Sequence, residues 1–408
     1  MRSQSQPLRL NTIALPAALI IGTLALFPAI AMSDDWIPED LVIGISGVSY
    51  KDPEFISADD QVVFMDSNNG LWVADLNPAT GFFNSASGFD YYLDQMGFPP
   101  SIPNGPEWTA NMTTSAVLYT KIDQEGYLQL WRAARPFASP NLIQMTNEST
   151  HAIGPLGSRD TQHNGSGVVF IRKQAKLLEV VAGPIGNLQS AQTIPNAIPG
   201  TSTRWVYGLN MIVYQFQDTN TEYNQLALYN PLTGSSQVLT NDTEYKSDVW
   251  GFKAPEYNNR LLVGAHINDG GFAIYGNTGA PDGYWRRIAT LRLPEDSPFQ
   301  YLNSVEPVET TLMGGDTTYF TAQGWEQDPE LAPDQSDVSI WVLGLGTDST
   351  NRFVRRVDEG AVSGDRKRRW DPESYIGDSE LFVYYNLYSG GGGFGELRRC
   401  TTGIPVGP

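Results

Sequence analysis

The chain has 408 residues, a formal net charge of −19 and a single cysteine, Cys400. This excess of acids argues against nucleic acid and anionic membrane surfaces as partners, because both repel a negative protein. One cysteine excludes an intrachain disulfide, whereas secreted eukaryotic proteins of this size usually carry several, so bacterial export is favoured.

The first 31 residues are expected to be a signal peptide. Arg2 and Arg9 are the only charges before an apolar run from residue 13 to residue 27, and Ala29-Ile30-Ala31 has the small-residue pattern of a cleavage site. The run is interrupted and short for a spanning helix, and an uncleaved anchor is the alternative. We predict that residues 32–408 form one exported domain, periplasmic or secreted, with no membrane insertion after cleavage.

Seven proline-centred phrases, each followed by an apolar, β-branched or aromatic run, mark the rest of the chain. They recur at intervals of 44 to 65 residues with no helical unit between them, and this period is typical of a β-propeller. The prolines are Pro53, Pro106, Pro155, Pro199, Pro255, Pro307 and Pro372. We predict an all-β, single-domain, seven-bladed propeller, with six blades as the alternative if the weak fourth repeat is absorbed into its neighbours.

The first repeat predicts how one blade is built. Residues 52–57 are expected to form the innermost strand, residues 62–65 the second and residues 71–76 the third. Later repeats add a fourth strand, as at residues 237–240, 286–291 and 352–356. The last repeat has only three obvious strands, so residues 41–45, which precede the first repeat, are expected to supply its fourth strand and close the ring.

The phrases DPEFISADDQVVF, from Asp52, and GLWVADLNPATG, from Gly70, resemble the TolB-type and WD40-like propeller repeats of bacterial exported proteins. This resemblance covers nearly the whole expected mature chain. It implies a propeller that docks protein partners in the cell envelope. We interpret the repeated prolines, turn acids and strand aromatics as packing and turn chemistry rather than as a site.

Four residues are candidates for catalysis because they fall in or beside loops expected on one face of the ring: His151, Arg204, Tyr245 and His266. His266 is expected at the end of the second strand of the fifth blade. A histidine can act as a general base near neutral pH, a tyrosine can donate a proton, and an arginine can neutralise a substrate carboxylate. The β-elimination of a uronic acid needs these three roles. In residue type, order and rough spacing the set resembles the constellation of seven-bladed polysaccharide lyases, including ulvan lyases.

A basic run is the second indication of an anionic ligand. Arg366-Lys367-Arg368-Arg369-Trp370 is expected in the loop that enters the seventh blade, where Arg366, Arg368 and Arg369 could hold sulfate or carboxylate groups and Trp370 could stack on a sugar ring. Tyr207 and Trp250 complete the predicted substrate contacts. A solvated surface run is the alternative.

Other chemistries lack a motif. The sequence has neither the His-Glu-x-x-His nor the paired-cysteine spacing of zinc sites, and no Gly-x-Ser-x-Gly elbow. Calcium is an alternative for the acids that follow Trp325, but a solvated loop is favoured and no cofactor is expected. These acids are Glu326, Asp328, Glu330, Asp334 and Asp337. Paired carboxylates for glycoside hydrolysis stay open, because 45 acids offer too many pairs to choose from.

Two functions of different class follow. The first is an exported protein that binds and cleaves a uronate-containing, sulfated or unsulfated, polysaccharide by β-elimination. The second is a non-catalytic TolB-like scaffold for an envelope protein. The histidine, arginine and tyrosine set and the basic run favour the first, and we expect a monomer.

Overall fold

The computed structural model describes residues 39–407 except for 98–104, 111–113, 159–166, 175–176, 185–187, 200–202, 207–208, 220–221, 310–312, 314, 329–336, 348–350, 359–367 and 389–394. The signal peptide predicted for residues 1–31 lies outside the described residues. Residues 38–408 form one compact unit. The described residues include no helix long and apolar enough to cross a membrane.

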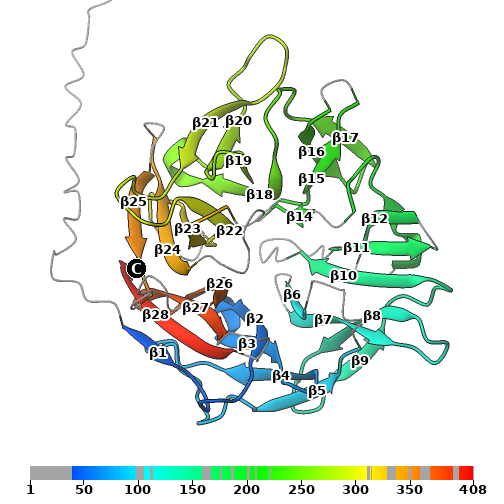
Figure 1. Cartoon of the computed structure of the whole chain (residues 1–408). Helices are drawn as coiled ribbons and strands as arrows, with labels where there is room; N and C mark the ends of the chain where they lie inside the picture. The colour runs from blue at the N-terminus through cyan, green and yellow to red at the C-terminus, as the bar shows by residue number, and fades with distance from the viewer. Residues whose placement is uncertain are drawn as a thin grey trace, which may run out of the picture. The chain divides into compact units, whose positions relative to one another are not determined.

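The described strands form seven four-stranded antiparallel sheets, numbered here along the chain (Figure 1). Sheet 1 contains β2 (Lys51–Ile56), β3 (Gln61–Met65), β4 (Gly70–Asp75) and β5 (Tyr91–Gln95), and sheet 2 contains β6 (Glu107–Ala110), β7 (Ser115–Ile122), β8 (Leu128–Ala134) and β9 (Asn141–Gln144). Sheet 3 contains β10 (His151–Gly157), β11 (Gly167–Gln174), β12 (Leu177–Pro184) and β13 (Gln192–Thr193), and sheet 4 contains β14 (Arg204–Trp205), β15 (Ile212–Gln217), β16 (Asn224–Asn230) and β17 (Ser235–Val238). Sheet 5 contains β18 (Ser247–Ala254), β19 (Arg260–His266), β20 (Phe272–Gly276) and β21 (Arg286–Leu291), and sheet 6 contains β22 (Tyr301–Pro307), β23 (Tyr319–Trp325), β24 (Val338–Leu345) and β25 (Asn351–Arg356). Sheet 7 contains β26 (Arg368–Ile376), β27 (Glu380–Tyr388), β28 (Glu396–Pro405) and the N-terminal strand β1 (Asp40–Val42). The prediction of an all-β propeller is confirmed, and the weak fourth repeat has a sheet of its own.

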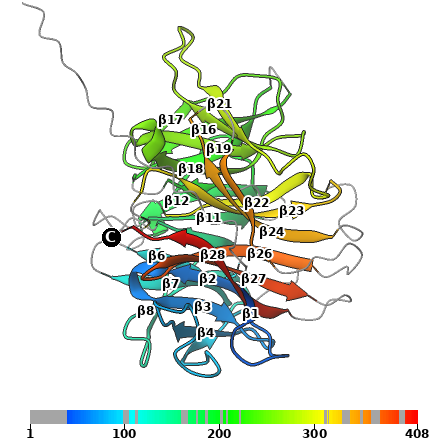
Figure 2. The same ribbon diagram turned by 90° about the vertical axis from the view of Figure 1, so that its left-hand side faces the viewer.

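The first strands of the seven sheets stand around the centre of the ring (Figure 1). Each lies beside the first strand of the next sheet, and β26 of the last sheet lies beside β2 of the first. Figure 2 shows the same sheets from the side, with β26, β27 and β28 next to β2, β3 and β4. Side chains of the first strands can therefore meet at the axis although they are far apart in the sequence.

The predicted closing strand is present. β1 pairs with β28 in antiparallel register, with Asp40 opposite Cys400, so the N-terminal strand becomes the outermost strand of sheet 7. Asp40 is 4% exposed; its Oδ1 accepts a 2.6 Å hydrogen bond from Arg398 Nε, and its Oδ2 accepts a 2.7 Å bond from the Tyr385 hydroxyl. This buried carboxylate joins the two ends of the described chain.

The core lies between neighbouring sheets. One apolar cluster joins sheets 1 and 2 through Val63, Val73, Trp108 and Tyr119, and other clusters join further neighbours. A similar cluster joins sheet 7 to sheet 1, where Phe55 stacks on Tyr384 at 4.2 Å between ring centroids. The last sheet is thus packed against the first by the same apolar contacts that join sequential sheets, which is how burial of apolar area stabilises the closed ring.

Five first strands contain a β-bulge at the same place. The paired register shifts between Lys51 and Glu54 in β2, and at equivalent points of β10, β18, β22 and β26. The residue at each bulge has a positive φ: Asp52, Gly154, Asp248, Ser304 and Asp371, with φ between 43° and 59°. This left-handed conformation is easy for glycine and tolerated by aspartate, and a bulge of this kind redirects the neighbouring side chains.

The positions of the bulges show that the seven repeats cannot be aligned with one another by their prolines. Pro53, Pro155 and Pro372 directly follow the left-handed residue, but in sheets 5 and 6 this position is taken by Val249 and Val305. Pro255 lies after β18 in a 3-10 helix, and Pro307 is the last residue of β22. The seven prolines are therefore not equivalent, although each sheet contains or adjoins one.

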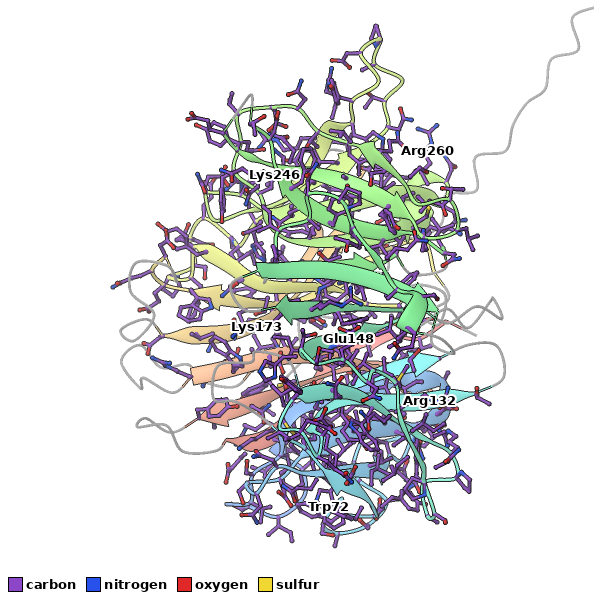
Figure 3. All side chains as sticks on the ribbon, turned by 90° about the vertical axis from the view of Figure 1, so that its right-hand side faces the viewer. Trp72, Arg132, Glu148, Lys173, Lys246 and Arg260 are labelled. Carbon is purple, nitrogen blue, oxygen red and sulfur yellow. The ribbon has the colours of Figure 1, made fainter. Side chains whose placement is uncertain are left out.

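A repeated hydrogen-bonded turn fixes the loops that enter sheets 3 and 5. The buried Gln129 donates to Glu148 O and accepts from Thr146 Oγ1, and Leu130 N donates to that same hydroxyl. Gln225, Thr240 and Leu226 repeat the arrangement two sheets later. Figure 3 labels Glu148 and Lys246, which belong to the segments that these two turns place. The turns satisfy buried backbone groups and hold the loops on one edge of the ring.

The substitution Asp40→Asn tests the closure of the ring. It keeps the shape of the side chain but removes the negative charge to which Arg398 and Tyr385 donate hydrogen bonds. The free energy of unfolding should therefore fall by about 2–3 kcal/mol. Leu41→Ala is the control, because Leu41 lies on the same strand and is 39% exposed, and it should cost less than about 0.5 kcal/mol. Urea denaturation measures both, and equal losses would contradict a special role for Asp40.

Candidate axial binding site

The first strands bring six acids together near the centre of the ring. The members of this axial acid cluster are Asp52 and Glu54 from β2, Glu107 from the start of β6, Asp248 from β18, Glu306 from β22 and Asp371 from β26. They are close enough for the charges of neighbouring acids to add to the effect of burial in raising the pKa of Asp52, Glu306 and Asp371. Three of them, Asp52, Asp248 and Asp371, are the left-handed residues of the bulges, and Glu54 and Glu306 follow two positions after such a residue.

Arg204 is the cation that β14 brings against this cluster. Its Nη2 lies 3.8 Å from Glu306 Oε1 and 4.0 Å from Asp248 Oδ1. Its guanidinium carbon lies 3.8 Å from the centroid of the Trp250 ring, on which it stacks. Arg204 is therefore held by two carboxylates and an aromatic ring.

Asp52 and Asp371 form a hydrogen-bonded carboxyl pair across the adjacent strands β2 and β26. Burial, and then the neighbouring acids, raises the pKa of both carboxyls, because two close carboxylates in a partly dehydrated site cannot both ionise easily. Gly105 N–H donates to Asp52, and a Cβ at position 105 would collide with the Asp52 carboxylate. Gly105 is therefore required at its position, because the Asp52 carboxyl lies too close to leave room for any side chain there.

Burial also raises the pKa of Glu306 to about 8, against the opposing charge of Arg204. The Glu306 side chain still keeps 23% of its surface exposed, so solvent reaches the site. At neutral pH the cluster thus contains carboxyls that hold protons and would release them if a positive charge entered.

His266 completes the site from the end of β19, as the sequence predicted for its position on the second strand. It is 8% exposed, and its Nε2 lies 3.6 Å from Asp248 Oδ2 without a hydrogen bond to any part of the chain that the structure describes. Burial lowers the pKa of the imidazole, and Asp248 opposes this shift. Arg204 and His266, two of the four predicted catalytic residues, therefore both lie beside Asp248, and their catalytic role remains a prediction.

There is less evidence that His151 and Tyr245 belong to the same site as Arg204 and His266. His151 begins β10, where its Nδ1 accepts a 3.0 Å hydrogen bond from Leu128 N and its ring lies edge-on to Tyr127. Tyr245 is partly buried in the segment between β17 and β18. The joint role predicted for these residues with Arg204 remains a prediction.

The basic run does not form a loop over its whole length. Arg368, Arg369 and Trp370 belong to β26, whereas Arg366 and Lys367 lie outside the described residues, as does Tyr207. Arg369 is 3% exposed, with its Nε 2.7 Å from Asp358 Oδ2, so it links sheets 6 and 7 and cannot reach a sugar. Trp370 is 42% exposed and packs edge-on against Trp325.

Trp250, a predicted substrate contact, lies within β18, where it is 4% exposed and its ring stacks against Arg204. The calcium alternative gains no support, since within the described part of the chain no three acid, histidine or cysteine side chains are placed to hold a metal ion. Of the five acids considered, Glu330 and Asp334 lie outside that part.

Sequence reasoning missed the axial acids. Their signal was present in the phrases Asp52-Pro53-Glu54, Gly105-Pro106-Glu107 and Asp371-Pro372-Glu373. These acids were interpreted as turn chemistry, because nothing in a single repeat shows that its first strand faces six others.

Three solved structures are similar to parts of this chain. It is similar to a putative TolB from Agrobacterium tumefaciens, with 12% identity and a TM-score of 0.38, over 62% of this chain and 79% of that one. It is similar to the β-propeller domain of the Trilobed protease from Pyrococcus furiosus, with 12% identity and a TM-score of 0.40, over 71% and 78%. A prolyl endopeptidase structure matches 87% of this chain with 11% identity and a TM-score of 0.49, but this chain spans only 50% of that protein.

At 11–12% identity and TM-scores from 0.38 to 0.49 these are similarities alone, and the fold is established by the sheets of the chain itself. No protein-family model and no curated protein matches the sequence.

The raised pKa of Glu306 predicts how stability depends on pH. A carboxyl whose pKa is higher in the folded state favours folding at low pH, and this contribution is lost as pH rises from 4.5 to about 8. The free energy of unfolding should therefore decrease across this window, by up to about 1.4 kcal/mol per pH unit for one proton. Glu306→Gln should reduce the slope and stabilise the protein at pH 8.

Thermal melts from pH 4 to 9 measure this effect. Glu125→Gln is the control, because Glu125 is exposed in the turn between β7 and β8 and should leave the slope unchanged. A slope that is the same in the wild type and in Glu306→Gln would show that Glu306 does not hold a proton near neutral pH.

Proposed function

We propose that the protein is a non-catalytic binding propeller that docks a protein partner in the bacterial cell envelope, after export to the periplasm or beyond. We count each four-stranded sheet as one blade, which gives a seven-bladed ring, and we place the binding site at the axial acid cluster. The proposal rests on the contacts that the Arg204 guanidinium makes within the protein. The group that a lyase would need for its substrate is already held by Asp248, Glu306 and Trp250.

The charge around Arg204 strengthens this argument. A lyase for uronic acids must bring the substrate carboxylate to a cation whose charge is available. Here the carboxyl groups of Asp248 and Glu306 both face the guanidinium, and four more acids lie in the same cluster. An anionic sugar would meet repulsion at this point, whereas a neutral or positive group would not.

The lyase remains the second candidate because of one observation. His266 and Arg204 both reach Asp248, as a general base and its orienting acid would. A polysaccharide that approached from the loops could meet His266 first, with Tyr245 as the proton donor and His151 as a further base. Arg366, Arg368, Trp370 and Tyr207 would then be its proposed substrate contacts.

A panel of uronate-containing polysaccharides separates the two functions. Elimination creates an unsaturated sugar end, which absorbs in the ultraviolet, and we expect no rise in absorbance with the purified mature protein. A rise that is lost in His266→Ala and in Tyr245→Phe, but kept in the surface variant Glu125→Gln, would overturn the scaffold proposal and establish the lyase.

Docking of a protein segment can be tested without knowledge of the natural partner. The mature protein is used to select from a library of displayed peptides, and the binding of each selected peptide is measured by calorimetry. We expect peptides whose affinity falls at least tenfold in Glu306→Gln or Asp371→Asn and is unchanged in Glu125→Gln. Failure to select any peptide, or selection of peptides indifferent to the axial variants, would contradict the proposed site.

A further inference from the structure

A glutamine on the second strand joins two of the sheets to the sheets that follow them. Gln215 of β15 donates a hydrogen bond from its amide to the carbonyl of Lys246, directly before β18. Gln323 of β23 donates in the same way, over 2.7 Å, to the carbonyl of Arg369 in β26. Each glutamine thus crosses from its own sheet to the first strand of the next, just before the bulge of that strand.

Asn386 occupies the equivalent position of sheet 7. Gln323 lies opposite Asn303, the last residue paired before the bulge of β22, and Asn386 lies opposite Trp370, the last residue paired before the bulge of β26. Side chains two residues apart on a strand leave it on the same face. Tyr384, two residues before Asn386, stacks on a phenylalanine of sheet 1. Asn386 is therefore directed at sheet 1, as Gln323 is directed at sheet 7.

Unlike Gln323, Asn386 reaches no partner. It is 1% exposed, and within the described part of the chain neither its Nδ2 nor its Oδ1 makes a hydrogen bond. Asparagine is one methylene shorter than glutamine, which explains why the amide stops short of the next sheet. Buried amide groups nearly always have a hydrogen-bond partner, because leaving them without one costs free energy.

The group that Asn386 faces is enclosed as well. The carbonyl of sheet 1 that corresponds to the Arg369 acceptor belongs to Tyr50, because Tyr50 directly precedes Lys51, the last residue paired before the bulge of β2. Tyr50 is 1% exposed. The adjacent Ser49 is 6% exposed, and its Oγ makes no hydrogen bond within the residues that the structure describes. Buried polar groups thus line both sides of the boundary between sheets 7 and 1.

We propose that Asn386 binds a water molecule enclosed between sheets 7 and 1, in place of the direct contact that Gln323 makes between sheets 6 and 7. Water both donates and accepts, so one molecule can bridge the amide of Asn386 and a polar group of sheet 1. Buried waters are held by two to four such partners. A larger ligand does not fit, because the residues on both sides are almost fully buried. This inference is independent of the docking function.

The substitution Asn386→Leu distinguishes a bound water from a dry boundary. It keeps the size of the side chain and removes both of its hydrogen-bonding groups. If water is bound, the water and its remaining partner lose a hydrogen bond, and the midpoint of thermal unfolding of the mature protein should fall by about 2 °C or more. If the boundary is dry, the change removes two unpaired polar atoms and raises the midpoint, which would overturn the proposal.

Asn141→Leu is the matched control. Asn141 is exposed at the start of β9, so the same exchange should shift the midpoint by less than about 1 °C. Asn386→Gln tests the comparison with Gln323. The longer side chain should reach sheet 1 and displace the water, which keeps the midpoint at or above that of the wild type. A fall of about 2 °C or more in this variant would contradict the equivalence of the two positions.

A crystal structure of the mature protein at high resolution identifies the occupant directly. We expect the density of one water about 2.7–3.2 Å from Nδ2 or Oδ1 of Asn386, and its loss in crystals of Asn386→Gln. Empty space beside the amide, or a direct hydrogen bond from Asn386 to sheet 1, would overturn the proposal. This outcome is decisive even where Asn386→Leu does not fold, because it is read from the wild-type protein.

Discussion

A left-handed residue in the first strand of a sheet is the constraint on which the axial site depends. Asp52, Asp248 and Asp371 adopt a conformation that costs an ordinary side chain free energy, and aspartate tolerates it better than most. The bulge that each creates aims acids at the axis instead of at a neighbouring sheet. Strain and like charge are thus concentrated at one place, which is common where a protein binds something else.

The rest of the ring provides the stability that this arrangement needs. Apolar clusters between neighbouring sheets, including the one that joins sheet 7 to sheet 1, hold the first strands together against the repulsion of their acids. The pairing of β1 with β28, and the buried contacts of Asp40, fix the point where the ring closes. Proton uptake by Glu306, Asp52 and Asp371 relieves the remaining repulsion and makes the site sensitive to pH.

The surroundings of the arginines bear on which of the two functions we propose. A basic run and a histidine, arginine and tyrosine set favoured an anionic sugar when only the sequence was considered. Arg369 proves to be buried against Asp358, and Arg204 is shared by Asp248 and Glu306, so neither guanidinium is presented to an anion. Acids are the main charged groups that the described residues place at the centre of the ring.

The sequence by itself determined the architecture, because the repeat period and the alternation of short apolar strands are local properties of the chain. It predicted the closing strand, the position of His266 at the end of a second strand, and much of the strand order. It could not determine the axial site, because the acids that form it come from five repeats, and acids of different repeats are 53 to 319 residues apart. Only the closed ring makes Asp52 a neighbour of Asp371, and only the packing of sheet 7 against sheet 6 buries Arg369. Such contacts arise from the packing of whole sheets, and no single repeat contains the information for them.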